Sequence, residues 1–130
     1  MLKVLLATQD KSIKKLYRDF YETSYDSTGT ILIHHGKAKY PGKSVKNYRF
    51  INLSMIDDAA EEKINSLANE LLLRYNLNKI FVVHRLGKIK KNDTILFIGV
   101  EAKERSSAFD AVRNLLEYIK TGNLFKLEEF

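Results

Sequence analysis

The chain has 130 residues and a formal net charge of +6, with 22 Lys plus Arg against 16 Asp plus Glu, and it contains no cysteine. The absence of cysteine excludes disulfide scaffolds, cysteine-based zinc sites, iron–sulfur clusters and thiol nucleophiles. No apolar run approaches the roughly 20 residues that cross a bilayer, and the first apolar residues are too few for a signal peptide, so we expect one cytoplasmic domain over residues 1–130.

The first half of the sequence alternates strand and helix patterns. Between Ser12 and Tyr21, apolar side chains recur at the spacing of one helix face. Apolar and β-branched residues predict strands over residues 2–7, 30–34 and, with imperfect alternation, 45–53. Turn-forming residues separate these segments at 26–29 and at 40–43, where the only proline lies.

The clearest helix begins the second half. It starts near Asp57 or Asp58, because Asp58 and Glu61 have the spacing of a capping box. Its apolar stripe continues to about Tyr75. Strands are then predicted over residues 80–83 and 94–102, with a turn at 90–93 between them.

One more helix completes the pattern. It begins at Ser106 or Ser107 and ends before Gly122, a residue typical of helix C-termini. The order is then β-α-β-β-α-β-β-α, followed by a short tail. Because this order implies both hairpin and crossover connections, we predict a single α+β domain with a mixed or antiparallel sheet and about three helices.

Positive charge is concentrated at one end of the sequence. Residues 1–50 carry 10 basic and 4 acidic side chains, whereas residues 51–130 carry 12 of each. The stretches 37–49 and 84–91 contain several basic residues and no acid. These patches indicate an anionic ligand, with a solvated face as the alternative. Because Tyr40 and Tyr48 interrupt the Lys37–Arg49 stretch, it also fits a basic nucleic-acid-binding module.

Familiar catalytic motifs are absent. The sequence holds no glycine-rich dinucleotide motif, no P-loop, no serine-hydrolase elbow and no zinc-protease motif. His34 and His35 are adjacent on a predicted strand and therefore point to opposite faces, and His84 ends another strand. We interpret all three histidines as structural or surface residues. The sequence thus predicts neither a metal site nor a bound cofactor.

The remaining candidates for chemistry are cationic. Lys37 and Lys39 follow a strand, in a loop that a Pro-Gly turn fixes. Arg105 lies near the start of the last helix, where free N–H groups favour an anion. Lys120 ends that helix, and Lys126 follows six residues later. Structural interpretations stay open, since a helix C-terminus favours a cation and a lysine in a tail can simply be solvated.

From about Thr28 to Thr121, the sequence resembles the large, catalytic subunit of molybdopterin synthase. Four segments carry the resemblance in matching order and spacing, namely residues 83–89, 93–100, 105–111 and 118–121. Gly29-Thr30 and the stretch from Gly36 to Lys39 correspond to the family's glycine-containing loop. The resemblance implies a single domain of this family over residues 1–130, with an α/β hammerhead fold, and a homodimer.

The resemblance also implies an activity. Each large subunit of the family binds a small ubiquitin-like subunit, giving a heterotetramer, and the small subunit's Gly-Gly tail ends in a thiocarboxylate. Sulfur passes from that tail to cyclic pyranopterin monophosphate and forms the dithiolene of molybdopterin. The chain is thus expected to be a sulfurtransferase of molybdenum cofactor biosynthesis, with no cofactor or metal of its own, no membrane contact, and no nucleic acid as its partner.

The family's functional residues fall on specific positions of this sequence. The resemblance places the two catalytic lysines at Lys120 and Lys126. It places substrate binding at Lys37, Lys39, Glu104, Arg105, Leu127 and Glu128.

The sequence departs from the family pattern at three of these positions. Lys39 stands where the family has arginine, which keeps the charge but loses the bidentate fork. Glu104 stands where the family has histidine, which reverses the polarity beside Arg105. Lys126 lies six residues after Lys120 instead of the usual seven.

Overall fold

The computed structural model describes residues 1–130, which form seven strands and three helices. The strands are β1 (Leu2–Ala7), β2 (Thr30–Lys37), β3 (Ile51–Met55), β4 (Lys79–Arg85), β5 (Gly87–Ile89), β6 (Thr94–Ala102) and β7 (Phe125–Glu129). The helices are α1 (Ile13–Tyr21), α2 (Ala60–Arg74) and α3 (Arg105–Thr121). None of the three combines the length and the apolar character needed to span a bilayer.

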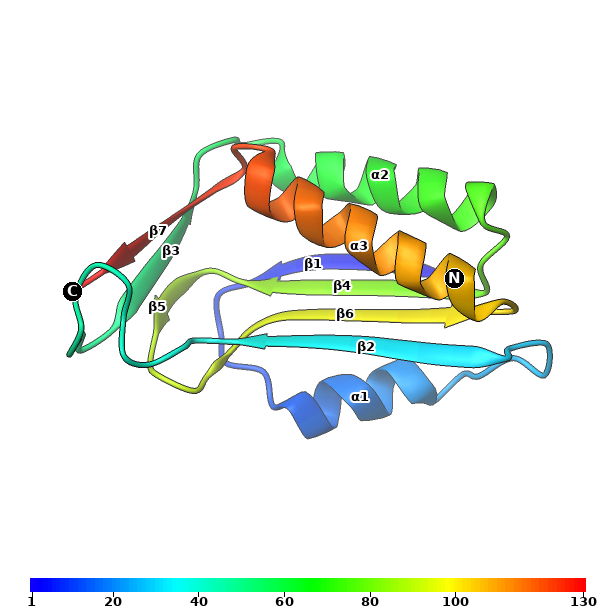
Figure 1. The fold of residues 1–130 in the computed structure, drawn as a ribbon, viewed down its shortest axis with the longest axis horizontal. Coiled ribbons are helices and arrows are strands. Elements are labelled where there is room, and N and C mark those ends of the chain that lie inside the picture. Colours follow the sequence, from blue (N-terminus) through cyan, green and yellow to red (C-terminus); the bar gives the residue numbers. More distant parts are fainter.

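Two sheets organise the molecule. The larger has the order β1-β4-β6-β2, with β1 parallel to β4 and the other pairs antiparallel. The smaller is antiparallel, with the order β5-β3-β7. Helices α2 and α3 cover one face of the larger sheet, α1 covers the other, and the smaller sheet stands at the end of the molecule where α3 ends (Figure 1). This arrangement confirms the predicted α+β class and helix number.

The larger sheet is apolar on both faces, because helices cover both. One face packs against buried side chains of α2 and α3, including Ile64 and Leu115. The other receives Phe20 of α1, whose ring meets Phe81 edge-on at a centroid distance of 5.3 Å. Gly99 permits this approach, since a Cβ atom there would lie 2.9 Å from the Phe20 ring. Burial on both faces explains why β4 and β6 are nearly continuous apolar runs.

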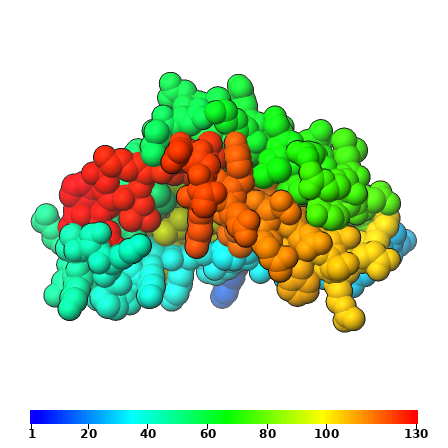
Figure 2. Space-filling model, turned by 45° about the horizontal axis from the view of Figure 1, so that its top comes forward, coloured from blue at the N-terminus to red at the C-terminus, as the bar shows by residue number.

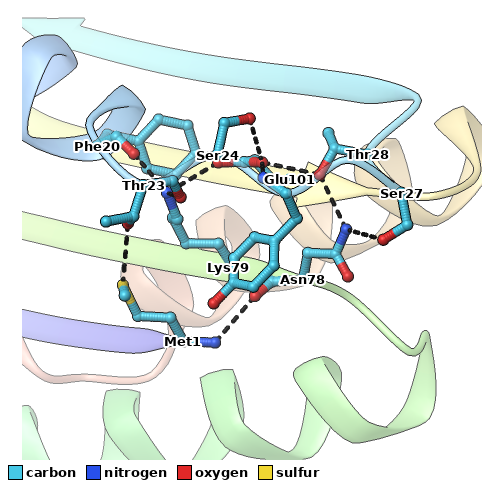
Figure 3. Close-up of polar contacts among 10 residues, drawn as sticks. Met1, Phe20, Thr23, Ser24, Ser27, Thr28, Asn78, Lys79 and Glu101 are labelled. Atoms are coloured by element: carbon cyan, nitrogen blue, oxygen red, sulfur yellow. Dashed lines mark hydrogen bonds and ion pairs between the residues drawn. The ribbon is translucent and has the colours of Figure 1, made fainter.

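A buried ion pair joins β4 to β6 at the far end of the larger sheet. The Lys79 ammonium lies 2.9 Å from a Glu101 carboxylate oxygen, and both side chains are 0% exposed. Lys79 also donates hydrogen bonds to the main-chain carbonyls of Phe20 and Thr23, at the end of α1 (Figure 3). The ammonium therefore ties α1 to the sheet.

The carboxylate of this pair is satisfied from the other side. Glu101 accepts hydrogen bonds from the hydroxyls of Thr28 at 2.8 Å and Ser24 at 3.0 Å, both in the segment before β2 (Figure 3). Burial alone would raise the pKa of Glu101, but the bonds from Lys79 and the two hydroxyls outweigh it and lower the pKa below its ordinary value. The Glu101 carboxylate is thus held ionised inside the fold.

The segment predicted as a strand over residues 45–53 forms a strand only from Ile51 onward. Before it, residues 38–50 make an irregular loop. The Glu129 carboxylate accepts hydrogen bonds from the backbone N–H groups of Lys43, Ser44 and Val45 at 2.9, 2.6 and 2.8 Å. The prediction was wrong for residues 45–50: Val45 bonds this distant carboxylate, and only Arg49 and Phe50 bond to a neighbouring backbone, that of Phe130 just after β7.

Other differences lie at the ends of elements. The predicted tail contains β7, which pairs with β3, and the additional strand β5 has only three residues. Helix α3 begins at Arg105, with Glu104 at the N-cap position, one or two residues earlier than predicted. At the start of α2, the Asp57 carboxylate accepts the Ala59 N–H at 2.8 Å, so Asp57 has the capping role that was predicted for Asp58.

Candidate active site

A cavity of about 780 Å³ opens where α3, the larger sheet and the smaller sheet meet. In Figure 2 the end of α3 (orange), β7 (red) and the segment after β2 (cyan to teal) come together at one end of the molecule. Ten of the seventeen lining residues are hydrophobic. The polar and charged lining residues are His34, Lys37, His84, Arg113, Glu117 and Lys120.

The register of the larger sheet builds the floor of this cavity. Leu96 of β6 pairs with His84 of β4 on one side and with Gly36 of β2 on the other. Residues paired in this way lie in one row across the sheet and point to the same face. The side of α3 that carries Val112 and Lys120 lies above this row. This part of the cavity therefore depends on three strands and one helix that are far apart in the sequence.

An irregularity in β2 brings Lys37 into the lining. The pairing of β2 with β6 shifts register between Gly36 and Lys37. In a regular strand two successive side chains point to opposite faces, but a bulge changes the direction of the next one. Lys37 accordingly lines the same cavity as Gly36, and its ammonium donates a hydrogen bond to Asn92 Oδ1 at 3.2 Å.

Lys120 enters the cavity from the last turn of α3. Gly122 follows at the C-cap and donates its N–H to the Tyr118 carbonyl at 2.8 Å. Of the predicted site residues, Lys120, Lys37 and Leu127 line the cavity. No acidic partner forms an ion pair with the Lys120 ammonium. Its charge is thus available to a ligand.

His34 faces the cavity, whereas His35 faces the α1 side of the sheet and bonds Thr94 Oγ1 at 2.9 Å. The predicted opposite orientation of these two histidines is confirmed. The imidazole of His34 lies over Gly36, since a Cβ atom there would be 3.2 Å from its Nε2. Burial and, secondarily, the positive charge of Lys120 lower the pKa of His34, so its ring is neutral near pH 7.

His84 lies deeper in the same cavity. It is 4% exposed, and its ring stacks on Phe125 with centroids 4.2 Å apart. Its Nδ1 lies 2.8 Å from the Arg85 carbonyl oxygen. The sequence predicted structural or surface roles for His34 and His84, and the stacking and hydrogen bond of His84 fit a structural role. Both histidines also line the cavity that Lys120 enters. Their shared position was not visible in the sequence, because it follows from the strand register.

The other predicted residues lie outside this cavity. Arg105 begins α3, fifteen residues before Lys120, so at 1.5 Å per residue the two lie about 22 Å apart along the helix. Lys126 and Glu128 alternate with Phe125 and Leu127, and their charged groups approach to 3.8 Å on the opposite face of β7. Glu104 precedes Arg105, and Lys39 lies in the loop after β2. Within one chain, these five residues do not join Lys120.

Sequence comparisons place the chain among known proteins. A family model described as "MoaE protein" matches residues 6–122. The molybdopterin synthase catalytic subunit of Escherichia coli strain K12 is 29% identical over 121 residues, covering 92% of this chain and 77% of the relative. The subunit of the same name from Salmonella typhimurium is 32% identical over 98 residues, covering 74% of this chain and 63% of the relative.

Solved structures share the fold. A crystal structure of molybdopterin synthase from Staphylococcus aureus aligns with a TM-score of 0.83 and 22% identity, covering 100% of this chain and 92% of that one. In a complex of subunits 1 and 2 of molybdopterin-converting factor from Helicobacter pylori, one chain aligns with a TM-score of 0.81 and 12% identity, covering 98% and 83%. These similarities confirm the fold that the resemblance implied. With its sequence matched over most of its length, the chain belongs to the MoaE family of molybdopterin synthase catalytic subunits.

Proposed function

We propose that this chain transfers sulfur from the thiocarboxylated C-terminus of a small ubiquitin-like subunit to cyclic pyranopterin monophosphate, forming the dithiolene of molybdopterin. The observation that carries the proposal is the cavity of a MoaE-family chain in which Lys120 has no ion-pair partner. The chain contains no cysteine, so the sulfur must arrive on another molecule.

The charge of the cavity suits this pair of reactants. Both the phosphate of the pterin and the thiocarboxylate are anions, which repel one another in solution. Lys120 and Lys37 supply positive charge at two sides of one cavity, from α3 and from β2. Cations fixed in a partly desolvated site hold two anions close together and stabilise the charge that develops during transfer. We assign Lys120 this role, together with proton transfer to or from the reacting group.

We further propose that the active assembly contains a homodimer. Arg105 and Lys120 lie at opposite ends of α3, about 22 Å apart. One pterin phosphate touches both groups only where two copies of the chain meet. The exposed side chain of Phe109, one turn after Arg105, supplies apolar surface for such a contact. In this arrangement Glu104 and Arg105 of one copy complete the cavity of the other.

A mixing experiment tests the dimer. R105A and K120A are each expected to be inactive as pure proteins. When equal amounts of the two variants are unfolded, mixed and refolded together, half of the dimers are hybrids with one intact site each, so up to about a quarter of wild-type activity returns. Absence of any recovery, with dimers present by light scattering, would contradict the shared site.

The partner is proposed from the family. The Helicobacter pylori structure is a complex of subunits 1 and 2 of the converting factor, which supports a small subunit as the partner here. In this proposal Lys126 and Glu128, on the outer face of β7, contact that subunit or its tail, and Lys39 contacts the substrate from the loop.

The decisive assay mixes the purified chain with a thiocarboxylated small subunit and cyclic pyranopterin monophosphate, and measures the dithiolene product. We expect product in proportion to the thiocarboxylate supplied. A folded chain that binds the small subunit and yields no product would contradict the proposal. The same small subunit with an ordinary carboxylate serves as the control.

The nucleic-acid alternative loses part of its basis in the structure. It relied on Tyr40 and Tyr48 as stacking rings. Tyr48 is only 4% exposed, and its hydroxyl donates to the Lys39 carbonyl oxygen at 2.8 Å. The Lys91 ammonium lies 4.5 Å from the centre of the Tyr40 ring. Tyr48 therefore presents no free face for base stacking, and a lysine already lies over the ring of Tyr40.

A further inference from the structure

We propose that Nε2 of His84 accepts a hydrogen bond from the pterin ring, which makes His84 a substrate-binding residue that orients the pterin in the cavity. The inference rests on the proposed function and adds a residue to it. Its basis is a buried imidazole that lines the cavity and uses only one of its two nitrogens within the protein.

The hydrogen bond of Nδ1 fixes the tautomer. The Arg85 carbonyl oxygen, 2.8 Å away, can only accept, so Nδ1 carries the hydrogen and donates it. In a neutral imidazole the other nitrogen then holds a free lone pair. No protein group donates to Nε2. His84 therefore offers an acceptor, and not a donor, to whatever occupies the cavity.

Packing fixes the plane of the ring. The His84 ring stacks on Phe125 at a centroid distance of 4.2 Å and an interplanar angle of 21°. Phe125 itself lines the cavity at the start of β7. Because the residue is only 4% exposed, a hydrogen bond that a ligand makes to Nε2 is worth more there than on the surface.

The ring stays neutral under ordinary conditions. Burial lowers the pKa of His84 below the usual value of 6.5, although the bond to Arg85 partly opposes the shift. The charged or titratable groups that face the same cavity are Arg113, Glu117 and Lys120 from α3 and His34 and Lys37 from β2, while β6 and β7 contribute apolar side chains. Nε2 of His84 is thus a hydrogen-bond acceptor in a cavity whose other charged groups are mainly cationic donors.

This contrast assigns an orientation to the substrate. Phosphate and thiocarboxylate carry only acceptors, which suit Lys37 and Lys120. A pterin carries an amino group and ring N–H groups, which are donors and suit Nε2 of His84. The pterin ring accordingly lies toward the floor of the cavity, against His84, and the phosphate lies toward the lysines.

Two measurements test the inference. Calorimetry compares binding of cyclic pyranopterin monophosphate by the wild-type protein, by H84F, which keeps an aromatic ring against Phe125, and by H35F as the control. Loss of one hydrogen bond predicts binding about tenfold weaker in H84F and unchanged in H35F. In turnover assays, H84F is expected to raise KM for the pterin more than it lowers kcat.

The second measurement needs no substitution. The chain has three histidines, so imidazole ¹⁵N resonances are readily assigned. In the free protein, Nε2 of His84 should show the shift of an unprotonated nitrogen, and it should move when the pterin is added.

The outcomes are separable. Equal pterin binding by wild type and H84F, or no change at Nε2 on binding, overturns the inference while leaving the proposed function intact. Failure of the wild-type protein to bind the pterin at all overturns the proposed function, and the role of His84 with it. If H84F does not fold, the resonance of the wild-type protein still decides.

Discussion

Two lysines at opposite ends of the molecule have opposite surroundings. Lys79 is completely buried, pairs with Glu101 at 2.9 Å and donates to two main-chain carbonyls. Lys120 lines an open cavity and has no ion-pair partner. The first ammonium is fully used by the fold, whereas the second is left over for a ligand.

This difference in partners separates the charged residues that stabilise the fold from those that can bind a ligand. A buried ion pair whose two charges face each other leaves neither charge for a substrate, although removing one partner is costly. A cation that shares a cavity with unpartnered imidazole nitrogen has capacity to bind. A search for buried charged residues would identify Lys79 as a candidate site residue. A search for donors and acceptors without a protein partner identifies Lys120 and His84 instead.

The largest effect should come from Lys120→Ala. If Lys120 transfers a proton or stabilises developing charge, its loss lowers the rate of dithiolene formation by at least about a hundredfold. The melting temperature should change little, because the side chain makes no ion pair. The control is Lys14→Ala, an exposed lysine of α1 on the other side of the sheet. Near-normal turnover in K120A would remove Lys120 from the mechanism.

Lys79→Met should give the opposite result. It leaves the Glu101 carboxylate buried without its cation, which costs about 3–5 kcal/mol of unfolding free energy. Urea denaturation measures the loss. Adding Glu101→Leu should recover part of it, because no buried charge then remains. A loss below about 1 kcal/mol in K79M would show that water reaches the pair.

Acid should lower the stability that the buried Lys79–Glu101 pair contributes. The folded pKa of Glu101 is lowered, so its contribution to stability is complete above the unfolded value of about 4.3 and is lost as the pH falls through the folded pKa. Unfolding free energy measured between about pH 6 and pH 3 should fall less steeply in Glu101→Gln than in wild type. Parallel curves would exclude Glu101 as a source of acid sensitivity.

The smallest effect concerns the cavity floor. In Gly36→Ala the new Cβ lies 3.2 Å from His34 Nε2 and 3.5 Å from Leu96 Cβ, so the imidazole must shift by a few tenths of an ångström. We expect a change in unfolding free energy within about 1 kcal/mol. Imidazole resonances of His34 should move while those of His35, on the other face, stay in place. Unmoved His34 resonances would contradict the contact.

Local sequence patterns predicted the helices and strands that depend mainly on neighbouring residues. The helix over residues 13–21 and the strand over residues 94–102 were found closely, because apolar spacing and β-branched runs specify them. The bounds of α3 were also found within two residues, since the helix begins at Arg105 and Gly122 is its C-cap. The resemblance to a known family supplied the role that we propose for Lys120, which spacing alone could not supply.

The pairing of strands that lie far apart in the sequence could not be predicted from local patterns. β7 pairs with β3, which lies far away in the sequence, and Glu129 stands opposite Ile51. The five residues of β7 contain no pattern that identifies β3 as their partner. The placement of His34 and His84 in one cavity likewise depends on the register of three strands. The sequence therefore did not show that His34 and His84 line one cavity, because each histidine was compared only with its own sequence neighbours.

The carboxylate of Glu129 has a consequence for spectroscopy. It holds the N–H groups of Lys43, Ser44 and Val45, which lie in an exposed loop without regular structure. Amide protons in such loops ordinarily exchange with solvent quickly. These three should exchange slowly for as long as β7 stays docked on β3. The exchange rates of these three amides therefore report whether β7 is attached to β3.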